Sequence, residues 1–190
     1  MKSISVLCVA IFFYGCGNES ATETTTPVTV EQPGVRVAFD DVKGLESVTE
    51  KDAAGNIISS GYLLNGKKES SWMTYTGTGL IKTLTSYVQD KKEGVYLEFA
   101  DNNTLKKKYF YHNDVRHGEY KEYNYAIQKE ERFYQNGKQE GTTKVYYDNG
   151  KVMEEGIYKN GLRDGVSKWY DQEGNVTIEY EYKNGELVKK

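Results

Sequence analysis

A short motif built around Asn-Gly recurs along this chain at an almost constant interval. The motif is an aromatic residue, then any residue, then Asn-Gly, and its three clearest copies begin at Tyr134, Tyr158 and Tyr182. Three weaker copies precede them, and the six central positions, from Asn65 to Asn184, are separated by 24, 24, 23, 24 and 24 residues. A constant period of about 20 to 50 residues is typical of a repeat array, in which each unit buries its apolar face against its neighbours.

The turn sequences within one period predict a β-hairpin. Asn136-Gly137 and Asp148-Asn149-Gly150 are turn signals, because Asn and Gly tolerate the positive φ angles that tight hairpin turns require. Each is followed by a segment of strand length, and proline, which interrupts sheet ladders, is absent after Pro33. We therefore predict an all-β fold, a repeat array of about five to six β-hairpins that form one elongated, twisted antiparallel sheet.

Two series of residues are predicted to share one face of this sheet. Two places after the second turn of each unit stand Ile57, Ile81, Leu105, Val152 and Val176. Six places further on stand Leu63, Tyr87, Tyr111, Tyr158 and Tyr182. Both offsets are even, and side chains alternate along a strand, so the two series are expected on the same face. The third unit is one residue short near Glu122–Ala126, which predicts a local irregularity there.

The N-terminal residues resemble a lipoprotein signal. Lys2 precedes an apolar run from Ile4 to Tyr14, which is too short to span a bilayer but matches the apolar part of a secretory signal. The run ends in Gly15-Cys16, similar to a bacterial lipobox, in which the cysteine is acylated after cleavage. The alternative is an ordinary signal peptide in which Cys16 is incidental. We expect a lipid attached at Cys16, which places the protein on a membrane surface.

The chain divides into four segments on this interpretation. Residues 1–16 are a lipoprotein-type signal peptide, and residues 17–34 are a polar, Thr-rich linker with both prolines, too poor in apolar side chains to order itself. Residues 35–60 are degenerate first strands that form an N-terminal cap. Residues 61–190 hold the repeats of about 24 residues.

The repeated pattern Tyr-x-Asn-Gly-Lys-x-x-Gly, followed by aromatic residues and Asp-x-x-Gly, resembles the variant form of the MORN repeat. The copies that begin at Tyr134 and Tyr158 are the nearest to it. The resemblance implies a chain of hairpins in one long sheet. Bacterial proteins of this kind are widely described as antitoxins of toxin–antitoxin systems, and eukaryotic MORN arrays are known as protein scaffolds and membrane-linked modules. Such an analogy of fold does not by itself establish function.

The sequence offers no constellation that predicts catalysis, a metal or a cofactor. His112 and His117 are the only histidines, both at expected turn positions, without paired cysteines or clustered carboxylates. A single-layer sheet also lacks the pocket that a catalytic triad needs. Acidic and basic residues, 28 and 25 in number, are interspersed, whereas nucleic acid binding requires a concentrated basic stripe. We expect a protein that is not an enzyme, without cofactor or nucleic acid partner.

Aromatic side chains are the candidates for a binding face. Packing between strands accounts for most of them, but they also suit stacking on a sugar or an extended peptide. The candidates are Trp72, Tyr75, Tyr123, Tyr146, Trp169 and Tyr170.

Three functions stay open at this point. The first is a non-catalytic, lipid-anchored scaffold that binds another protein at the bacterial envelope, in the outer membrane if the organism is Gram-negative. The second is an antitoxin or immunity-like protein that neutralises a toxin by binding it. The third is a surface protein that binds cell-wall glycan.

Overall fold

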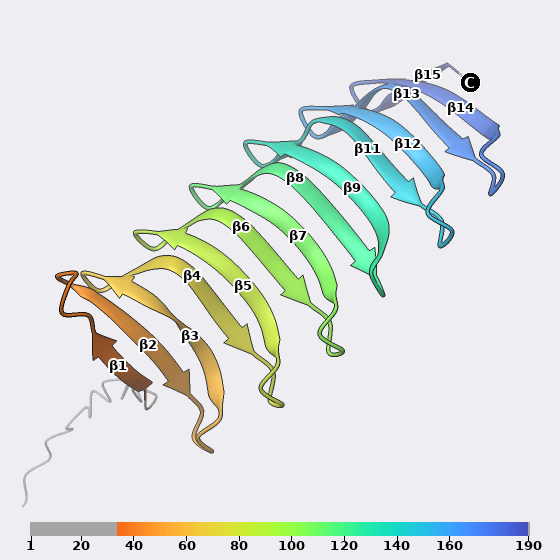
Figure 1. The fold of residues 1–190 in the computed structure, drawn as a ribbon. Helices are drawn as coiled ribbons and strands as arrows, with labels where there is room; N and C mark the ends of the chain where they lie inside the picture. Colours follow the sequence, from red (N-terminus) through yellow and green to blue (C-terminus); the bar gives the residue numbers. More distant parts are fainter. Residues whose placement is uncertain (1–33, 190) are drawn as a thin grey trace, which may run out of the picture. The chain divides into compact units, whose positions relative to one another are not determined.

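The computed structural model describes residues 34–189, and these form one antiparallel sheet without helices (Figure 1). The N-terminal half contains β1 Gly34–Ala38, β2 Leu45–Lys51, β3 Ile57–Leu64, β4 Lys67–Tyr75, β5 Ile81–Val88, β6 Lys91–Phe99, β7 Leu105–His112 and β8 Val115–Asn124. The C-terminal half contains β9 Ile127–Gln135, β10 Lys138–Gln139, β11 Gly141–Tyr146, β12 Val152–Lys159, β13 Leu162–Tyr170, β14 Val176–Lys183 and β15 Glu186–Lys189. The predicted fold class is confirmed.

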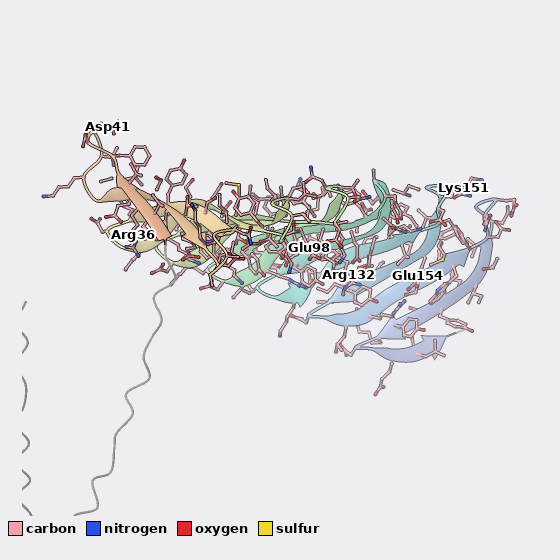
Figure 2. The ribbon with its side chains drawn as sticks, turned by 90° about the horizontal axis from the view of Figure 1, so that it is seen from below. Arg36, Asp41, Glu98, Arg132, Lys151 and Glu154 are labelled. Carbon is pink, nitrogen blue, oxygen red and sulfur yellow. The ribbon has the colours of Figure 1, made fainter. Side chains whose placement is uncertain are left out.

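The strands lie in the sheet in the order of the chain. Each pairs with the strand before it and the strand after it, except that the short β10 lies off the path and pairs with β9 only. The sheet is a single layer with side chains on both faces, and it twists along its length (Figure 2). The sheet does not close, so β1 and β15 are its two edges. None of the described residues forms a helix that could cross a membrane.

Two-residue turns connect one set of hairpins. Both residues of each turn have positive φ, for example 54° at Asn160 and 88° at Gly161, which is the requirement of a type I′ turn. Both φ angles are also positive at Gln89 and Asp90, 49° and 70°, where the sequence departs from Asn-Gly. The central position of the motif therefore marks a turn in every unit from Asn65 onward.

The turns of neighbouring units are hydrogen-bonded to one another. The N–H of Gly161 donates to the carbonyl of Gln139 at 2.9 Å, and the N–H of Gly185 donates to that of Arg163 at 2.8 Å. A carboxylate beside each such carbonyl accepts the N–H of the first turn residue, as Glu140 does from Asn160 at 2.8 Å. This arrangement recurs in four units and satisfies backbone groups at the end of each hairpin. The donors and acceptors are Gln89 to Glu69, Asn113 to Glu93, Asn160 to Glu140 and Asn184 to Asp164.

His117 takes the place of this carboxylate in the third unit. Its Nδ1 lies 3.5 Å from the N–H of Asn136, a longer and weaker contact than the carboxylates make. The same unit has the expected irregularity at its other end. Its strands β8 and β9 are joined by only Tyr125 and Ala126, both with positive φ, where other units have a loop of five residues such as 52–56. The loop is thus three residues shorter, while β8 and β9 have 10 and 9 residues against 9 and 8 in β6 and β7, so the unit as a whole is one residue short and the sheet stays intact.

Each hairpin carries an irregularity near its two-residue turn. Pairing runs from Ser60 opposite Met73 to Tyr62 opposite Glu69, so Gly61 faces three residues of β4. The one nearest the turn, Ser70, has a φ of 62°, and glycine with positive φ stands at its equivalents in the later units. Positive φ costs about 1–2 kcal/mol for a residue other than glycine, which explains the recurrent glycine of the motif. The glycines are Gly94, Gly118, Gly141 and Gly165.

Candidate functional site

Strand register divides the side chains between two faces, because residues directly opposite each other in paired strands lie on the same face. Trp72 is opposite Thr85, Tyr96 is opposite Tyr109, and Tyr109 is also opposite Tyr120. We call the face that carries these residues the tyrosine face. It also holds the tyrosines of the 24-residue motif, since Tyr111 stands two places after Tyr109 in the regular register of β7 with β6.

The tyrosine face contains the most buried apolar side chains of the sheet. One cluster joins Val48, Leu63 and Trp72, with Tyr87 packed against it. A second cluster joins Tyr109, Tyr120 and Tyr134, with Tyr96 and Tyr111 at its side. The ring centroids of Tyr96 and Tyr109 are 4.4 Å apart in a stacked arrangement, and those of Tyr109 and Tyr120 are 5.7 Å apart. Aromatic pairs of this kind contribute about 0.5–1.5 kcal/mol beyond their burial.

A row of cationic side chains runs beside these aromatic rings. Lys68 Nζ lies 4.1 Å from the centre of a Trp72 ring, and Lys92 Nζ lies 5.0 Å from that of Tyr111. The guanidinium of Arg116 lies 4.8 Å from the ring centre of Tyr109. These residues stand two places before the positive-φ position of their units, so one falls in each of three successive repeats. We call Lys68, Lys92 and Arg116 the cation row.

Further along the face, cations are held by carboxylates. Arg163 forms an ion pair with Glu154 and donates from Nη1 to the hydroxyl of Ser167 at 2.9 Å. Arg132 forms an ion pair with Glu130. Burial opposes the charge of Arg132, but hydrogen bonds to Tyr134 and Glu130 outweigh it and raise the pKa of Arg132. In the C-terminal part of the face, both arginines are thus bound to carboxylates of the same sheet.

The aliphatic residues that follow the second turn lie on the face opposite the tyrosine face, which corrects the expectation that they share a face with the motif tyrosines. We call them the aliphatic series: Ile57, Ile81, Leu105, Val152 and Val176. Ile81 pairs with Tyr75, whereas Tyr87 pairs with Ser70, five residues from Tyr75 on the same regular strand. Residues an odd number of places apart on a regular strand lie on opposite faces, so the partners Ile81 and Tyr87 do as well. The cause is a β-bulge at Lys82, which adds one residue to β5 and reverses the alternation of its side chains.

The bulge recurs in the other long-loop units. It separates Leu105 from Tyr111, Val152 from Tyr158 and Val176 from Tyr182, since the register shifts between Glu98 and Phe99, between Val145 and Tyr146, and between Trp169 and Tyr170. The bulged residues are part of the 24-residue repeat period. The period therefore does not show which residue of the strand is unpaired.

The six predicted binding residues are therefore divided between two faces. Trp72 and Trp169 lie on the tyrosine face, where Trp72 is 6% exposed and Trp169 packs edge-on against Tyr180. The other four lie on the opposite face with the aliphatic series: Tyr75, Tyr123, Tyr146 and Tyr170. The sheet does not bring the six together into one surface, and binding by any of them stays a prediction.

The shortened turn of the third unit leaves a hollow beside it. Glu98, Phe99 and Lys106 line it from β6 and β7, and Tyr123 and Tyr125 line it from the next hairpin. Its polar groups already satisfy each other, because Lys106 Nζ lies 3.0 Å from the Glu98 carboxylate. Tyr125 is the most exposed large apolar residue here, at 76%. We find no convergent set of free polar groups in this hollow.

The two histidines lie at the turn ends of adjacent strands, as expected. Their ring centroids are 6.0 Å apart, and His112 Nδ1 lies 2.9 Å from the carboxylate of Glu93. Hydrogen bonds from His112 and from the N–H of Asn113 lower the pKa of Glu93. Within residues 34–189, no group of three or more His, Cys, Asp or Glu side chains is arranged to hold a metal ion. Cys16 and the predicted signal peptide lie outside the described residues.

Comparison with known proteins agrees with this class of architecture, an open array of antiparallel hairpins. The family model described as MORN repeat variant matches residues 92–113, 139–160 and 163–184. These three segments therefore match the variant form of the MORN repeat, which confirms the resemblance seen in the motif. The shortened third unit falls between the first two matches.

Other comparisons add little. No curated protein is significantly similar to the chain. A crystal structure of an S. aureus TarM mutant in complex with fondaparinux, alpha-GlcNAc-glycerol and UDP is 14% identical, with a TM-score of 0.37. The match covers 57% of this chain and 21% of that one, so the chain spans about a fifth of its length. A likeness of this extent supports no conclusion on function.

Proposed function

We propose that this protein is a non-catalytic repeat module that binds another protein on its tyrosine face. MORN repeats suggest a protein that binds other molecules. The observation that supports a protein partner is the composition of this face, where buried and half-buried tyrosines lie beside cations in a single layer, with no second layer of described residues over them. Aromatic residues and arginine are enriched in protein interfaces and carry much of their binding energy.

Site-specific photo-crosslinking tests the face. A photoreactive amino acid in place of Tyr111 is on the tyrosine face, and one in place of the neighbouring Phe110 is on the opposite face. With full-length protein in its own cells, we expect a reproducible crosslinked protein from position 111 and none from position 110. Crosslinks from position 110 alone, or from neither position, would contradict the proposal.

We further propose that a lipid on Cys16 holds the module at the bacterial envelope. The support is the apolar run that ends in Gly15-Cys16. Incorporation of a labelled fatty acid is expected in the wild type and absent in Cys16→Ala. Undiminished labelling of the variant would refute the anchor.

The partner identified by crosslinking separates the scaffold from the antitoxin alternative. A toxin whose activity falls when this protein is co-expressed would make the role immunity-like. The glycan alternative depends on Trp169, because Trp72 is almost fully covered. Retention on peptidoglycan that is lost in Trp169→Ala would support a glycan ligand in place of a protein.

A further inference from the structure

The cation row differs from Arg132 and Arg163 of the tyrosine face in having no carboxylate partner. Among residues 34–189 there are four arginines, and Arg36, Arg132 and Arg163 each form an ion pair with a glutamate. Arg116 forms none of the ion pairs found in this part of the chain, and neither do Lys68 and Lys92.

Comparison of equivalent positions shows why Arg116 lacks a partner. Arg163 binds Glu154, which stands six residues before the turn residue Asn160, and the equivalent residue before Asn113 is Lys107. A lysine cannot accept a hydrogen bond from a guanidinium. The equivalent of Ser167, the other partner of Arg163, is Tyr120 in this unit. Both groups that hold Arg163 are thus exchanged around Arg116.

Tyrosine rings hold the Arg116 guanidinium in place of a carboxylate. Its Cζ lies 4.8, 5.8 and 5.7 Å from the ring centres of Tyr109, Tyr120 and Tyr134. Burial opposes its charge, but interactions with Tyr109 and Tyr134 outweigh this and raise the pKa of Arg116. Arg116 as a whole is nonetheless exposed to solvent. An ordered guanidinium open to solvent presents several donors in a geometry that suits a carboxylate.

The acidic residues near the row already have partners. The Glu98 carboxylate is paired with Lys106, and the Glu122 carboxylate accepts the hydroxyl of Tyr120 at 2.6 Å. The three cations of the row form none of the ion pairs of this region, whereas Lys106 is paired with Glu98. A ligand with single, spaced negative charges matches three separate cations, whereas a compact phosphate concentrates its charge at one of them.

The spacing of the row indicates the conformation of such a ligand. Its members lie on β4, β6 and β8, with one strand between each pair (Figure 1). Two strand spacings amount to about 9–10 Å. A polyproline II segment has three residues per turn and rises about 9 Å in one turn, so every third side chain points the same way at this interval.

We propose that the row Lys68, Lys92 and Arg116 binds an extended acidic segment of a partner protein whose carboxylates recur at every third residue. The segment lies across the strands and stacks on the tyrosine face between the cations. This inference rests on the proposed function, because it names the kind of partner that the same face takes. The row ends after Arg116, where Gln139 stands at the equivalent position.

A synthetic peptide of three Glu-Pro-Pro units tests the proposal with the full-length protein in detergent, by fluorescence anisotropy. We expect saturable binding that weakens with added salt. A peptide with Gln in place of Glu should bind at least about tenfold more weakly, and so should one with the same three Glu placed consecutively. Equal affinity for all three peptides would overturn the proposal. Equal affinity for the spaced and the consecutive Glu peptides would overturn the inference that the carboxylates recur at every third residue.

Variants locate the site. Arg116→Gln and Lys92→Gln are each expected to weaken binding about five- to tenfold. Lys91→Gln, which neutralises the adjacent residue on the opposite face, should change it less than about twofold. Arg116→Lys keeps the charge without the guanidinium and should lie between them, and circular dichroism checks that each variant folds. An equal loss of peptide binding in Lys91→Gln would overturn the assignment. Vesicles of phosphatidylglycerol are the second probe. If they bind in a way that requires Arg116 while the peptide does not bind, the assignment is also overturned.

Photo-crosslinking at position 111 separates this inference from the proposed function. If Arg116→Gln still crosslinks the same partner as efficiently as the wild type, the partner binds the tyrosine face but not through this row, and the inference is wrong. If no partner crosslinks in the wild type, the proposed function fails, whereas the peptide titration still decides the chemistry of the row.

Discussion

The carboxylate of Glu140 accepts a hydrogen bond from the backbone N–H of Asn160 at 2.8 Å, and so connects one hairpin to the turn of the next. The two residues are twenty positions apart in the chain. The same contact in three other units makes it a repeated link along the turn edge of the sheet.

Removal of this link should destabilise the sheet. We expect Glu140→Ala to lower the free energy of unfolding by about 0.5–1.5 kcal/mol, because the Asn160 N–H loses its acceptor. Glu173→Ala is the control, since the Glu173 side chain makes none of the hydrogen bonds or ion pairs found within residues 34–189. Urea denaturation measures both, and an equal effect of the two exchanges would refute the role of the link.

Restoration of the link in the third unit should stabilise the sheet. His117→Glu places a carboxylate opposite the N–H of Asn136, where the histidine contact is 3.5 Å long. We expect a gain of about 0.5–1 kcal/mol near neutral pH, measured by urea denaturation. His117→Gln, which has no charge, should give a smaller gain. A loss of stability in His117→Glu would show that repulsion from Glu93 exceeds the benefit of the new hydrogen bond.

The stability of the last hairpin should depend on pH through Asp164. Hydrogen bonds from Lys183 and from the N–H of Asn184 lower the pKa of Asp164 below 3.8. The ionised form is thus favoured in the folded state, so its contribution is present above about pH 4 and is lost as pH falls through the lowered pKa. Asp164→Asn should have a lower urea midpoint than the wild type at pH 6, and the difference should shrink at pH 3. A difference of the same size at both values would contradict this mechanism.

Close approach of two strands requires glycine at Gly61. A Cβ at this position would lie 2.3 Å from Cε3 of Trp72. Gly61→Ala must displace the indole ring, and we expect a loss of about 1–3 kcal/mol with a change in tryptophan fluorescence. Gly77→Ala is the matched control, because a Cβ there meets no atom within 4 Å. Similar unfolding curves for the two variants would show that the close contact with Trp72 does not determine the stability of the sheet.

The short turn of the third unit should gain stability from glycine. Ala126 has a φ of 68°, which costs about 1–2 kcal/mol for a residue with a Cβ. We expect Ala126→Gly to stabilise the sheet by about 0.5–1 kcal/mol in urea denaturation. The same exchange in Ala100, which is not among the residues with positive φ, should destabilise it by gain of freedom in the unfolded chain. Destabilisation by both exchanges would rule out strain at Ala126.

Much of the fold follows from local chemistry, and this part could be predicted from the sequence. Asn160-Gly161 can form a tight turn with both φ angles positive at low cost, so the motif determines where hairpins turn and how many there are. The missing residue near Ala126 could also be placed for the same reason. Each of these features depends on residues next to each other in the chain.

Only the tertiary structure decided which side chains share a face. A single unpaired residue at Lys82 reverses the alternation of β5, so Ile81 and Tyr87 lie on opposite faces in spite of their even offset. The pairing that leaves Lys82 unpaired involves β4, and the strand itself carries no mark of it. The absence of a carboxylate partner for Arg116 also depends on the tertiary structure, because the residues around its guanidinium come from neighbouring strands. Hydrogen-bond register between strands, rather than the period of the repeat, therefore determines the candidate binding surface of this protein.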